Sequence, residues 1–266
     1  MITLLHPSID PVIVSFGSLS IRWYGLSYVI GLILGIFLIK KINQNLENGI
    51  SKKFIDDFFI WGAIGIILGG RIGYMIFYQF SNLIHNPISI FYIWQGGMSF
   101  HGGLLGIGIS IIVFSKLKKI NFLALSDLVS TAAPIGLFFG RIANFINSEL
   151  YGKITSFPIA MIFPTIDYER RHPSQLYEAL FEGIIIFIVL LFITRNKLIK
   201  NRIGLNTAIF LILYGVFRTI LETLREPDFH IGYLFNYFTM GQILSTPMII
   251  LGLFILLKVK NARYQK

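Results

Sequence analysis

Long apolar runs dominate this chain and recur from near its beginning to near its end. Seven runs stand out, at residues 19 to 39, 54 to 78, 97 to 115, 126 to 147, 176 to 194, 205 to 224 and 240 to 257. Runs of about 20 apolar residues cross a bilayer as helices, whereas a β-barrel would show short alternating segments. The pattern predicts an all-α polytopic membrane protein with about seven transmembrane helices, forming one integral membrane domain over 1–266.

The composition supports this class of protein and excludes some kinds of functional site. Hydrophobic residues make up 55% of the chain and charged residues only 14%, against about 25% charged residues in a typical soluble domain. The chain has no cysteine, which excludes disulfides, thiolate nucleophiles and cysteine metal sites. Its five histidines show no metal-ligand spacing. We therefore expect no metal and no other cofactor.

The basic residues gather in alternate loops, and this distribution predicts the topology. A formal net charge of +10 could indicate nucleic-acid binding, but most bases flank the apolar runs on one side. The clustered bases are Lys40, Lys41, Lys52, Lys53, Lys116, Lys118, Lys119, Arg195, Lys197, Lys200, Arg202, Lys258, Lys260, Arg263 and Lys266. By the positive-inside rule that side is cytoplasmic. We expect the N-terminus outside, the C-terminus in the cytoplasm and no nucleic-acid partner.

Two segments outside the runs are expected on the outer side. Residues 1–18 contain Pro7, Asp10 and Pro11 and lack a basic start, so they resemble an external arm rather than a signal peptide. Residues 149–175, between the fourth and fifth runs, hold Pro158 and Pro164 and are expected to form a small external head.

Polar side chains crowd the outer ends of six of the seven runs. Ionisable groups at membrane depth are costly unless they face a protein interior or a water-filled cavity, so they indicate a functional site. The residues concerned are Arg22, Tyr24, Arg71, His101, Arg141, Asn144, Glu149, Gln175, Tyr177, Glu178, Glu182, Tyr214, Arg218, Glu222 and Arg225.

Several of these residues have purely structural explanations. Arg22 and Arg225 are expected to anchor helices at the lipid head groups. Glu178 and Glu182 share a helical face at i and i+4, and we expect them to neutralise a neighbouring arginine rather than to take part in chemistry.

Glycines recur in two of the runs. The repeats Gly65-x-x-x-Gly69-x-x-x-Gly73 and Gly102-x-x-x-Gly106 are typical of closely packed helices. Glycines also flank His101 in the segment 95–103, which suits a backbone that approaches a ligand closely.

Three arginines decide the expected chemistry. Arg71, Arg141 and Arg218 carry permanent charges on planar forks that suit bidentate contacts with phosphate. Glu149 and Glu222 would balance only two of them, and a phospholipid head group would balance the third. The residues alone thus predict a laterally open site that binds an anionic lipid from the outer leaflet.

The motifs around these residues resemble one known family over nearly the whole chain. The segment 140–149, Gly-Arg-Ile-Ala-Asn-Phe-Ile-Asn-Ser-Glu, is similar to the signature of the bacterial prolipoprotein diacylglyceryl transferases. Further matches lie at 21–25, 69–74, 96–103, 171–178, 214–218, 225–228 and 240–242, in the family's order. Ala143 and Ser148 stand where the family usually has glycine.

This resemblance implies transfer of a diacylglyceryl group from phosphatidylglycerol to the lipobox cysteine of a prolipoprotein signal peptide, at the outer face of the bacterial inner membrane. The implied catalytic residues are Tyr24, His101, Arg141, Glu149 and Arg218. Phosphatidylglycerol would be bound by Arg141, Asn144, Tyr214, Arg218 and Glu222, with Arg71 added on grounds of charge.

The group that accepts the thiol proton stays open at this stage. His101 is the best candidate, because an unperturbed histidine is mostly neutral at physiological pH. Deprotonation assisted by the phosphate or an arginine would leave His101 an orienting residue.

Two other function classes are weaker. A transporter would place its site near the midplane, usually between repeated halves, and no repeat is evident here. A non-catalytic lipid-binding scaffold would explain the arginines but not the segment around His101.

Overall fold

The computed structural model describes residues 4–17, 19–46, 50–92, 97–196, 199, 202–227, 232–234 and 237–259. Within this part, six helical stretches are long and apolar enough to cross a membrane, as expected of a multi-pass membrane protein. They are α1 (Trp23–Asn43), α2 (Lys52–Tyr78), α4 (Phe100–Lys118), α5 (Phe122–Ile146), the stretch Ser174–Arg195 and α9 (Met240–Lys258). The run predicted at 205 to 224 forms the shorter apolar helix α8 (Leu205–Leu221). The number of spans stays a prediction.

The stretch Ser174–Arg195 has three parts. It begins as α6 (Ser174–Glu178), continues as a π-helical segment η3 (Ala179–Ile185) and ends as α7 (Ile186–Arg195). π-Helical turns are rare and often mark functional sites.

The first predicted run begins too early. Residues Leu19–Arg22 form strand β3, which pairs antiparallel with β2 (Val12–Phe16), and α1 starts only at Trp23. Strand β3 contains Leu19 and Ile21 and leads directly into the helix, so hydrophobicity alone did not mark the boundary between them. A short helix α3 (Phe80–His85) and a 3₁₀ segment η1 (Pro87–Phe91) follow α2, and neither was predicted.

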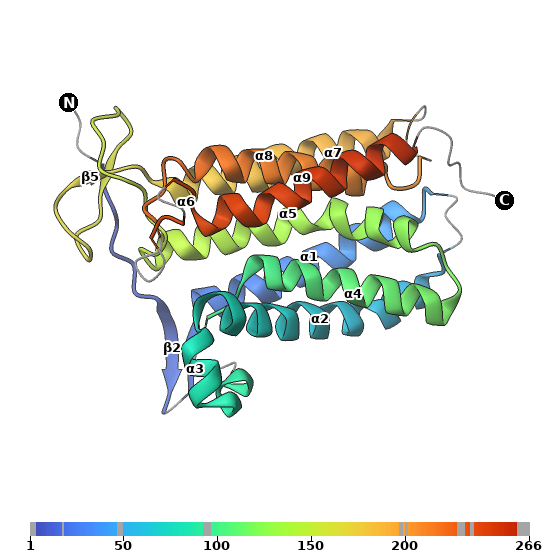
Figure 1. Ribbon diagram of the computed structural model, residues 1–266, viewed down its shortest axis with the longest axis horizontal. Coiled ribbons are helices and arrows are strands. Elements are labelled where there is room, and N and C mark those ends of the chain that lie inside the picture. The colour runs from blue at the N-terminus through green and yellow to red at the C-terminus, as the bar shows by residue number, and fades with distance from the viewer. Residues whose placement is uncertain are drawn as a thin grey trace.

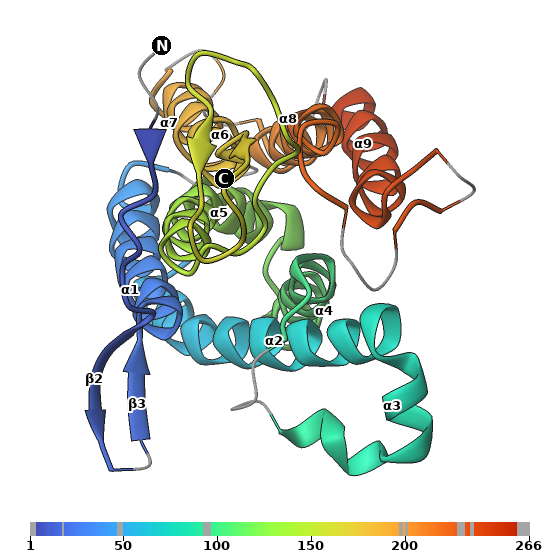
Figure 2. The same cartoon turned by 90° about the vertical axis from the view of Figure 1, so that its left-hand side faces the viewer.

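Helix α5 lies at the centre of the bundle, with α1 on one side and α7 and α8 on another (Figure 2). Helices α2 and α4 pack together through the glycine repeats, as predicted. A Cβ on Gly69 would collide with the backbone of Gly102 and Gly106, and one on Gly73 would meet the Gly102 Cα. Small residues therefore allow the two helix backbones to touch.

A buried carboxylate fixes the start of α8. Asp127 of α5 accepts hydrogen bonds from the backbone amides of Gly204 at 2.6 Å and Thr207 at 2.9 Å. The side chain of Asn206 donates to Thr131 Oγ1 at 2.6 Å and to Thr194 Oγ1 at 2.7 Å. These contacts satisfy amides at the α8 N-terminus and join α5, α7 and α8 at one end of the bundle.

The predicted arm and head meet in one small sheet beyond the other end of the bundle (Figure 1). Strand β1 (Leu4–Leu5) pairs parallel with β4 (Met161–Ile162), which pairs antiparallel with β5 (Arg170–Arg171). Arg171 Nη2 lies 2.6 Å from Asp167 Oδ2, and its Nη1 lies 3.1 Å from Glu226 Oε2. The hydrogen-bonded guanidinium lowers the pKa of the Asp167 carboxyl. The head is thereby tied to the segment that follows α8.

Candidate active site

The polar side chains predicted to share one leaflet do gather at one end of the bundle. This end collects the N-terminal turns of α1, α4 and α9 and the C-terminal turns of α5 and α8, because these helices alternate in direction (Figure 1). The side chains that it brings together include Tyr24, His101, Arg141, Tyr214, Arg218 and Glu222.

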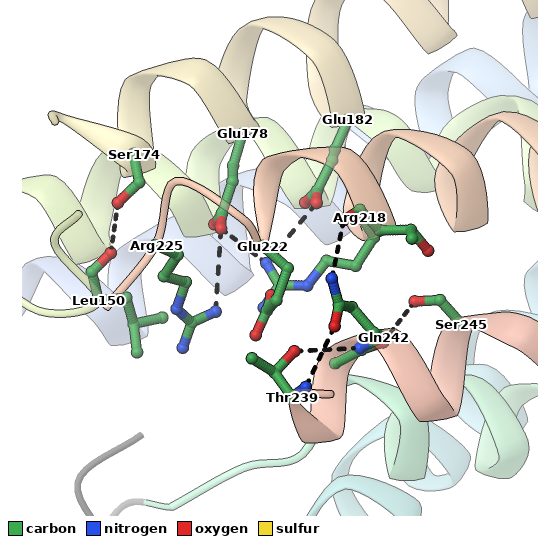
Figure 3. Close-up of polar contacts among 12 residues, drawn as sticks. Leu150, Ser174, Glu178, Glu182, Arg218, Glu222, Arg225, Thr239, Gln242 and Ser245 are labelled. Atoms are coloured by element: carbon green, nitrogen blue, oxygen red, sulfur yellow. Dashed lines mark hydrogen bonds and ion pairs between the residues drawn. The ribbon is translucent and has the colours of Figure 1, made fainter. Parts of the chain in front are cut away.

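A buried ion cluster occupies this end. Arg141 donates to Glu182 Oε2 from Nε at 3.1 Å and from Nη2 at 2.9 Å, and its Nη1 lies 2.9 Å from Glu178 Oε2. Arg218 Nη1 lies 2.7 Å from Glu178 Oε1, and its Nη2 lies 2.6 Å from Glu222 Oε2. Figure 3 shows Glu178 and Glu182 pointing towards Arg218 and Glu222. Glu178 thus bridges the two arginines.

Arg225 completes the cluster, and its predicted role as an interfacial anchor is wrong. It is 5% exposed, and its Nη1 lies 3.8 Å from Glu178 Oε1. A β-bridge joins Arg225 to Gly152, and the Glu226 amide donates to the Tyr151 carbonyl. This pairing holds the segment after α8 against the segment after α5, which leaves the Arg225 side chain buried. Arg22, in contrast, is exposed, and its role as an interfacial anchor stays a prediction.

The charges of the cluster balance, which corrects the sequence argument. The prediction that Glu178 and Glu182 neutralise an arginine is confirmed, and with Glu222 they provide three carboxylates for Arg141, Arg218 and Arg225. Within this cluster an anionic lipid is therefore not needed to balance Arg141 and Arg218. Removing one member of such a buried network costs about 3–5 kcal/mol, because it leaves its partner uncompensated.

Close backbone contacts bring the cluster together. A Cβ on Gly183 would come within 2.7 Å of Phe138 Cβ, so glycine lets the π-helical segment approach α5 and carry Glu182 to Arg141. A Cβ on Gly241 would lie 2.8 Å from the Glu222 carboxyl, so glycine leaves room for that carboxylate at the start of α9. A capping box between Thr239 and Gln242 fixes this helix start.

Glu149 does not hold an arginine, contrary to prediction. Within the described part of the chain its carboxylate accepts from Asn144 Nδ2 at 3.2 Å and from Asn147 Nδ2 at 3.3 Å. Its backbone carbonyl accepts from Gln175 Nε2 at 2.7 Å. Tyr24, whose hydroxyl lies 3.2 Å from that of Tyr28, is within electrostatic reach of Glu149 and Arg141. Glu149 therefore orders the amides beside the cluster.

Arg71 is buried but has other partners. Its Nη2 donates to the Ser89 carbonyl at 2.6 Å and its Nε to the Ile90 carbonyl at 3.3 Å. Its guanidinium also lies 5.9 Å from the centre of the Tyr74 ring. The structure thus gives Arg71 the role of holding the η1 segment against α2, and a contact with lipid phosphate stays a prediction.

Several buried polar atoms in and around the cluster have no hydrogen-bond partner among the described residues. Two of them belong to residues predicted to act in the site: Nε2 of His101, which is 8% exposed, and the hydroxyl of Tyr214, which is fully buried. Both side chains lie within electrostatic reach of Arg141 and Arg218. Buried polar groups without partners are uncommon, and such groups often mark a catalytic role or an unseen ligand.

The two departures from the family's glycines differ in consequence. Ala143 is buried in ordinary helix, where a small side chain fits. Ser148 has a φ of 54°, in the left-handed region that favours glycine. Its hydroxyl lies 3.4 Å from His6 Nδ1, and His6 Nε2 lies 2.8 Å from the Phe145 carbonyl. His6 thus ties the N-terminal arm to the signature segment, a link that no sequence signal indicated.

Some predicted positions lie outside the described residues. Among the motifs these are Gln95, Gly96 and Asp228, and among the clustered bases Lys197, Lys200, Lys260, Arg263 and Lys266.

The fold and the site define a helical membrane protein with a charged, buried site at one end of its bundle. The family model for prolipoprotein diacylglyceryl transferase matches residues 11–258. The chain is 50% identical over 259 residues to the phosphatidylglycerol–prolipoprotein diacylglyceryl transferase of Rickettsia typhi, covering 97% of this chain and all of that protein. It is 47% identical over 257 residues to the enzyme of that name from Rickettsia bellii, covering 97% and 98% of the two chains. The chain therefore belongs to the prolipoprotein diacylglyceryl transferase family.

Proposed function

We propose that this chain transfers the diacylglyceryl group of phosphatidylglycerol to the cysteine thiol of a prolipoprotein lipobox and releases glycerol phosphate. This reaction would be the first step of bacterial lipoprotein maturation. The observation that carries the proposal is the pair Arg141 and Arg218, held by buried carboxylates beside His101 Nε2 and the Tyr214 hydroxyl, which have no hydrogen-bond partner among the described residues. Such a site suits the two substrates that the relatives' shared name gives, a phospholipid donor and a protein acceptor.

The arginines would bind and stabilise the leaving phosphate. A guanidinium has five N–H donors, and the contacts to the glutamates use fewer than five on either Arg141 or Arg218. The remaining donors can bind phosphate oxygens while the carboxylates hold each fork in place. Preorganised donors of this kind stabilise charge that develops in the transition state without reorganising first.

The proposed reaction replaces a C–O bond of the phospholipid with a C–S bond to the peptide. The cysteine sulfur attacks the glyceryl carbon that carries the phosphate ester, a C–S bond forms, and the C–O bond breaks. The phosphate leaves with the electron pair as glycerol phosphate. The thiol proton passes to Nε2 of His101, where it adds positive charge beside Arg141 and Arg218 that the bound phosphate balances. The absence of cysteine in this chain fits, because the sulfur belongs to the substrate.

The other predicted residues would orient the substrates. Tyr24, Asn144 and Tyr214 offer hydroxyl and amide groups for lipid oxygens, and Glu149 fixes the Asn144 amide at 3.2 Å. Glu222 holds Arg218 at 2.6 Å and thereby acts on phosphate binding indirectly.

The site would face the outer leaflet of the bacterial inner membrane, in a single domain of seven spans with the N-terminus outside. Support comes from the lysines at the opposite ends of the helices, Lys40 and Lys41 in the last turn of α1 and Lys116 and Lys118 in the last turn of α4. An outward site meets a signal peptide exported across the membrane. The arm and the head would then lie on the outer surface.

The test is a reaction of the purified protein with phosphatidylglycerol and a synthetic lipobox peptide. Mass spectrometry should find a thioether-linked diacylglyceryl peptide, and a peptide with serine in place of the cysteine should stay unmodified. Lipid movement between leaflets without this product would favour a transporter. Lipid binding without either would favour a scaffold.

A further inference from the structure

A groove of about 810 Å³ runs beside α1 from the middle of the bundle towards the end opposite the candidate active site. Residues of α1 and its C-cap, of α5 and of α7 line it. They are Leu34, Phe37, Leu38, Lys40, Lys41, Gln44, Ile135 and Phe187. The groove is large enough for a small molecule or part of a lipid, since ligand sites commonly measure about 300–1,000 Å³.

The helix arrangement explains why a groove forms here. A Cβ on Gly31 of α1 would lie 3.0 Å from the Gly136 Cα of α5, so these two helices are in close contact. Helix α5 lies between α1 and α7 (Figure 2). Ile135 of α5 therefore lies between the α1 side chains and Phe187 of α7.

The lining is divided into an apolar part and a basic end. Leu34, Phe37, Ile135 and Phe187 form the apolar part, and the Phe37 side chain is 68% exposed. Lys40 and Lys41 follow in the last turn of α1, about 10 Å along the axis from Leu34 to Lys41. An apolar groove that ends at cations is complementary to a phospholipid, whose acyl chains lie next to an anionic phosphate.

The two lysines differ in how much charge they can offer. Lys40 forms an ion pair with Asp56 at the start of α2. In the described part of the chain no carboxylate lies within ion-pair distance of Lys41, which is exposed at the edge of the groove. Among the described residues, no carboxylate thus neutralises the charge that Lys41 presents where a lipid head group would lie. Basic pockets between transmembrane helices commonly bind anionic lipids.

We propose that this groove binds one anionic phospholipid from the leaflet opposite the active site. Its phosphate would contact Lys41 and, less strongly, Lys40, and one acyl chain would lie over Phe37, Ile135 and Phe187. The bound lipid would fill the space between α1 and α7, and it would not be consumed in the transfer reaction. The site is distinct from the one proposed for phosphatidylglycerol as substrate.

Photocrosslinking of the full-length protein tests the proposal. The probes are phosphatidylserine and phosphatidylcholine with a diazirine on one acyl chain, incorporated in turn into vesicles around the protein. Peptide mapping should find adducts at Phe37 or Phe187, with phosphatidylserine labelling them more strongly. Each lysine should contribute up to about fivefold to labelling at limiting lipid.

Three variants sharpen the test. Lys41→Gln should reduce phosphatidylserine labelling of the groove by about fivefold. Ile135→Trp should reduce it by filling the space. Lys53→Gln is the matched control, an exposed lysine at the same end that does not line the groove, and it should change nothing.

Three results would overturn the proposal: equal labelling by the two lipids, unchanged labelling in Lys41→Gln, or adducts confined to the active-site end. The transfer activity is not part of this readout. Failure here would therefore leave the proposed enzymatic function standing.

Discussion

Arg141 donates to one oxygen of Glu182 from two nitrogens, Nε at 3.1 Å and Nη2 at 2.9 Å, and the Glu182 side chain is fully buried. This geometry fixes the plane of the guanidinium as well as its position. The two residues come from α5 and the π-helical segment, so their contact joins the signature motif to a helix segment 41 positions later. Changes to the cluster should therefore affect both stability and turnover.

Glu178 and Glu182 should differ when each is changed to glutamine. Glu178 contacts Arg141, Arg218 and Arg225, whereas Glu182 makes its short contacts with Arg141 alone. Glu178→Gln should lower the free energy of unfolding by about 3–5 kcal/mol and Glu182→Gln by less. Thermal unfolding in detergent measures both. A Glu182→Gln protein less stable than Glu178→Gln would contradict the bridging role of Glu178.

His101→Gln tests whether His101 is the base. If His101 accepts the thiol proton in the rate-limiting step, glutamine should lower kcat by about a hundredfold or more, with little change in lipid binding. The measurement is the pH profile of peptide lipidation in variant and parent. Turnover within a few fold of the parent, with the acidic limb unchanged, would exclude the base role and favour deprotonation assisted by the phosphate and an arginine.

Asp167→Asn should loosen the head in a pH-dependent way. The Arg171 guanidinium lowers the pKa of the Asp167 carboxyl, so the ion pair stabilises the head fully at pH values above the ordinary carboxyl pKa of about 4. This stabilisation is lost as the pH falls through the lowered pKa of Asp167. At pH 7 the Thr155 amide, bonded to the Arg170 carbonyl, should exchange about two- to fivefold faster in the variant. At pH 3 the difference in exchange rate between the variant and the parent should be smaller.

Hydrogen exchange followed by mass spectrometry measures this effect. Asp10→Asn is the control, because Asp10 is exposed and accepts from the Val12 amide in the arm rather than from Arg171. An equal difference between Asp167→Asn and the parent at both pH values would disprove the role of the ion pair.

Reporter fusions test the proposed orientation. Fusions after Lys119 and after Arg202 should report the cytoplasm, since both follow clusters of basic residues, and one near Thr165 in the head should report the outer side. The reverse pattern would place the ion cluster on the cytoplasmic leaflet, out of reach of an exported signal peptide.

The sequence predicted that the polar side chains would gather at one end of the bundle, because helix length and direction set the depth of each residue. Arg141, Arg218 and His101 came together for this reason. It also predicted that Glu178 and Glu182 would neutralise an arginine, because their spacing places them on one face.

The contacts that sequence missed depend on how irregular segments fold. Arg225 lies just past the end of α8, where an interfacial and an interior residue look alike in sequence. Arg71 binds carbonyls of the η1 segment, whose course no periodicity reports. His6 reaches the signature motif across more than a hundred positions through a short strand pairing.

The most direct test of the central claim compares transfer by the parent, Arg141→Lys and Arg22→Lys. The assay uses phosphatidylglycerol labelled separately in its acyl chains and its head-group glycerol, with a lipobox peptide. Lysine keeps the charge of Arg141 but cannot reproduce a fork that contacts Glu178 and Glu182 together. Arg22 is exposed and serves as the matched control.

The parent should move the acyl label to the peptide and release the glycerol label as glycerol phosphate in equal amounts. Arg141→Lys should lower both by about a hundredfold or more, with the protein still folded and inserted, and Arg22→Lys should stay within a few fold of the parent. Near-parental transfer by Arg141→Lys, or acyl transfer without release of glycerol phosphate, would contradict the account.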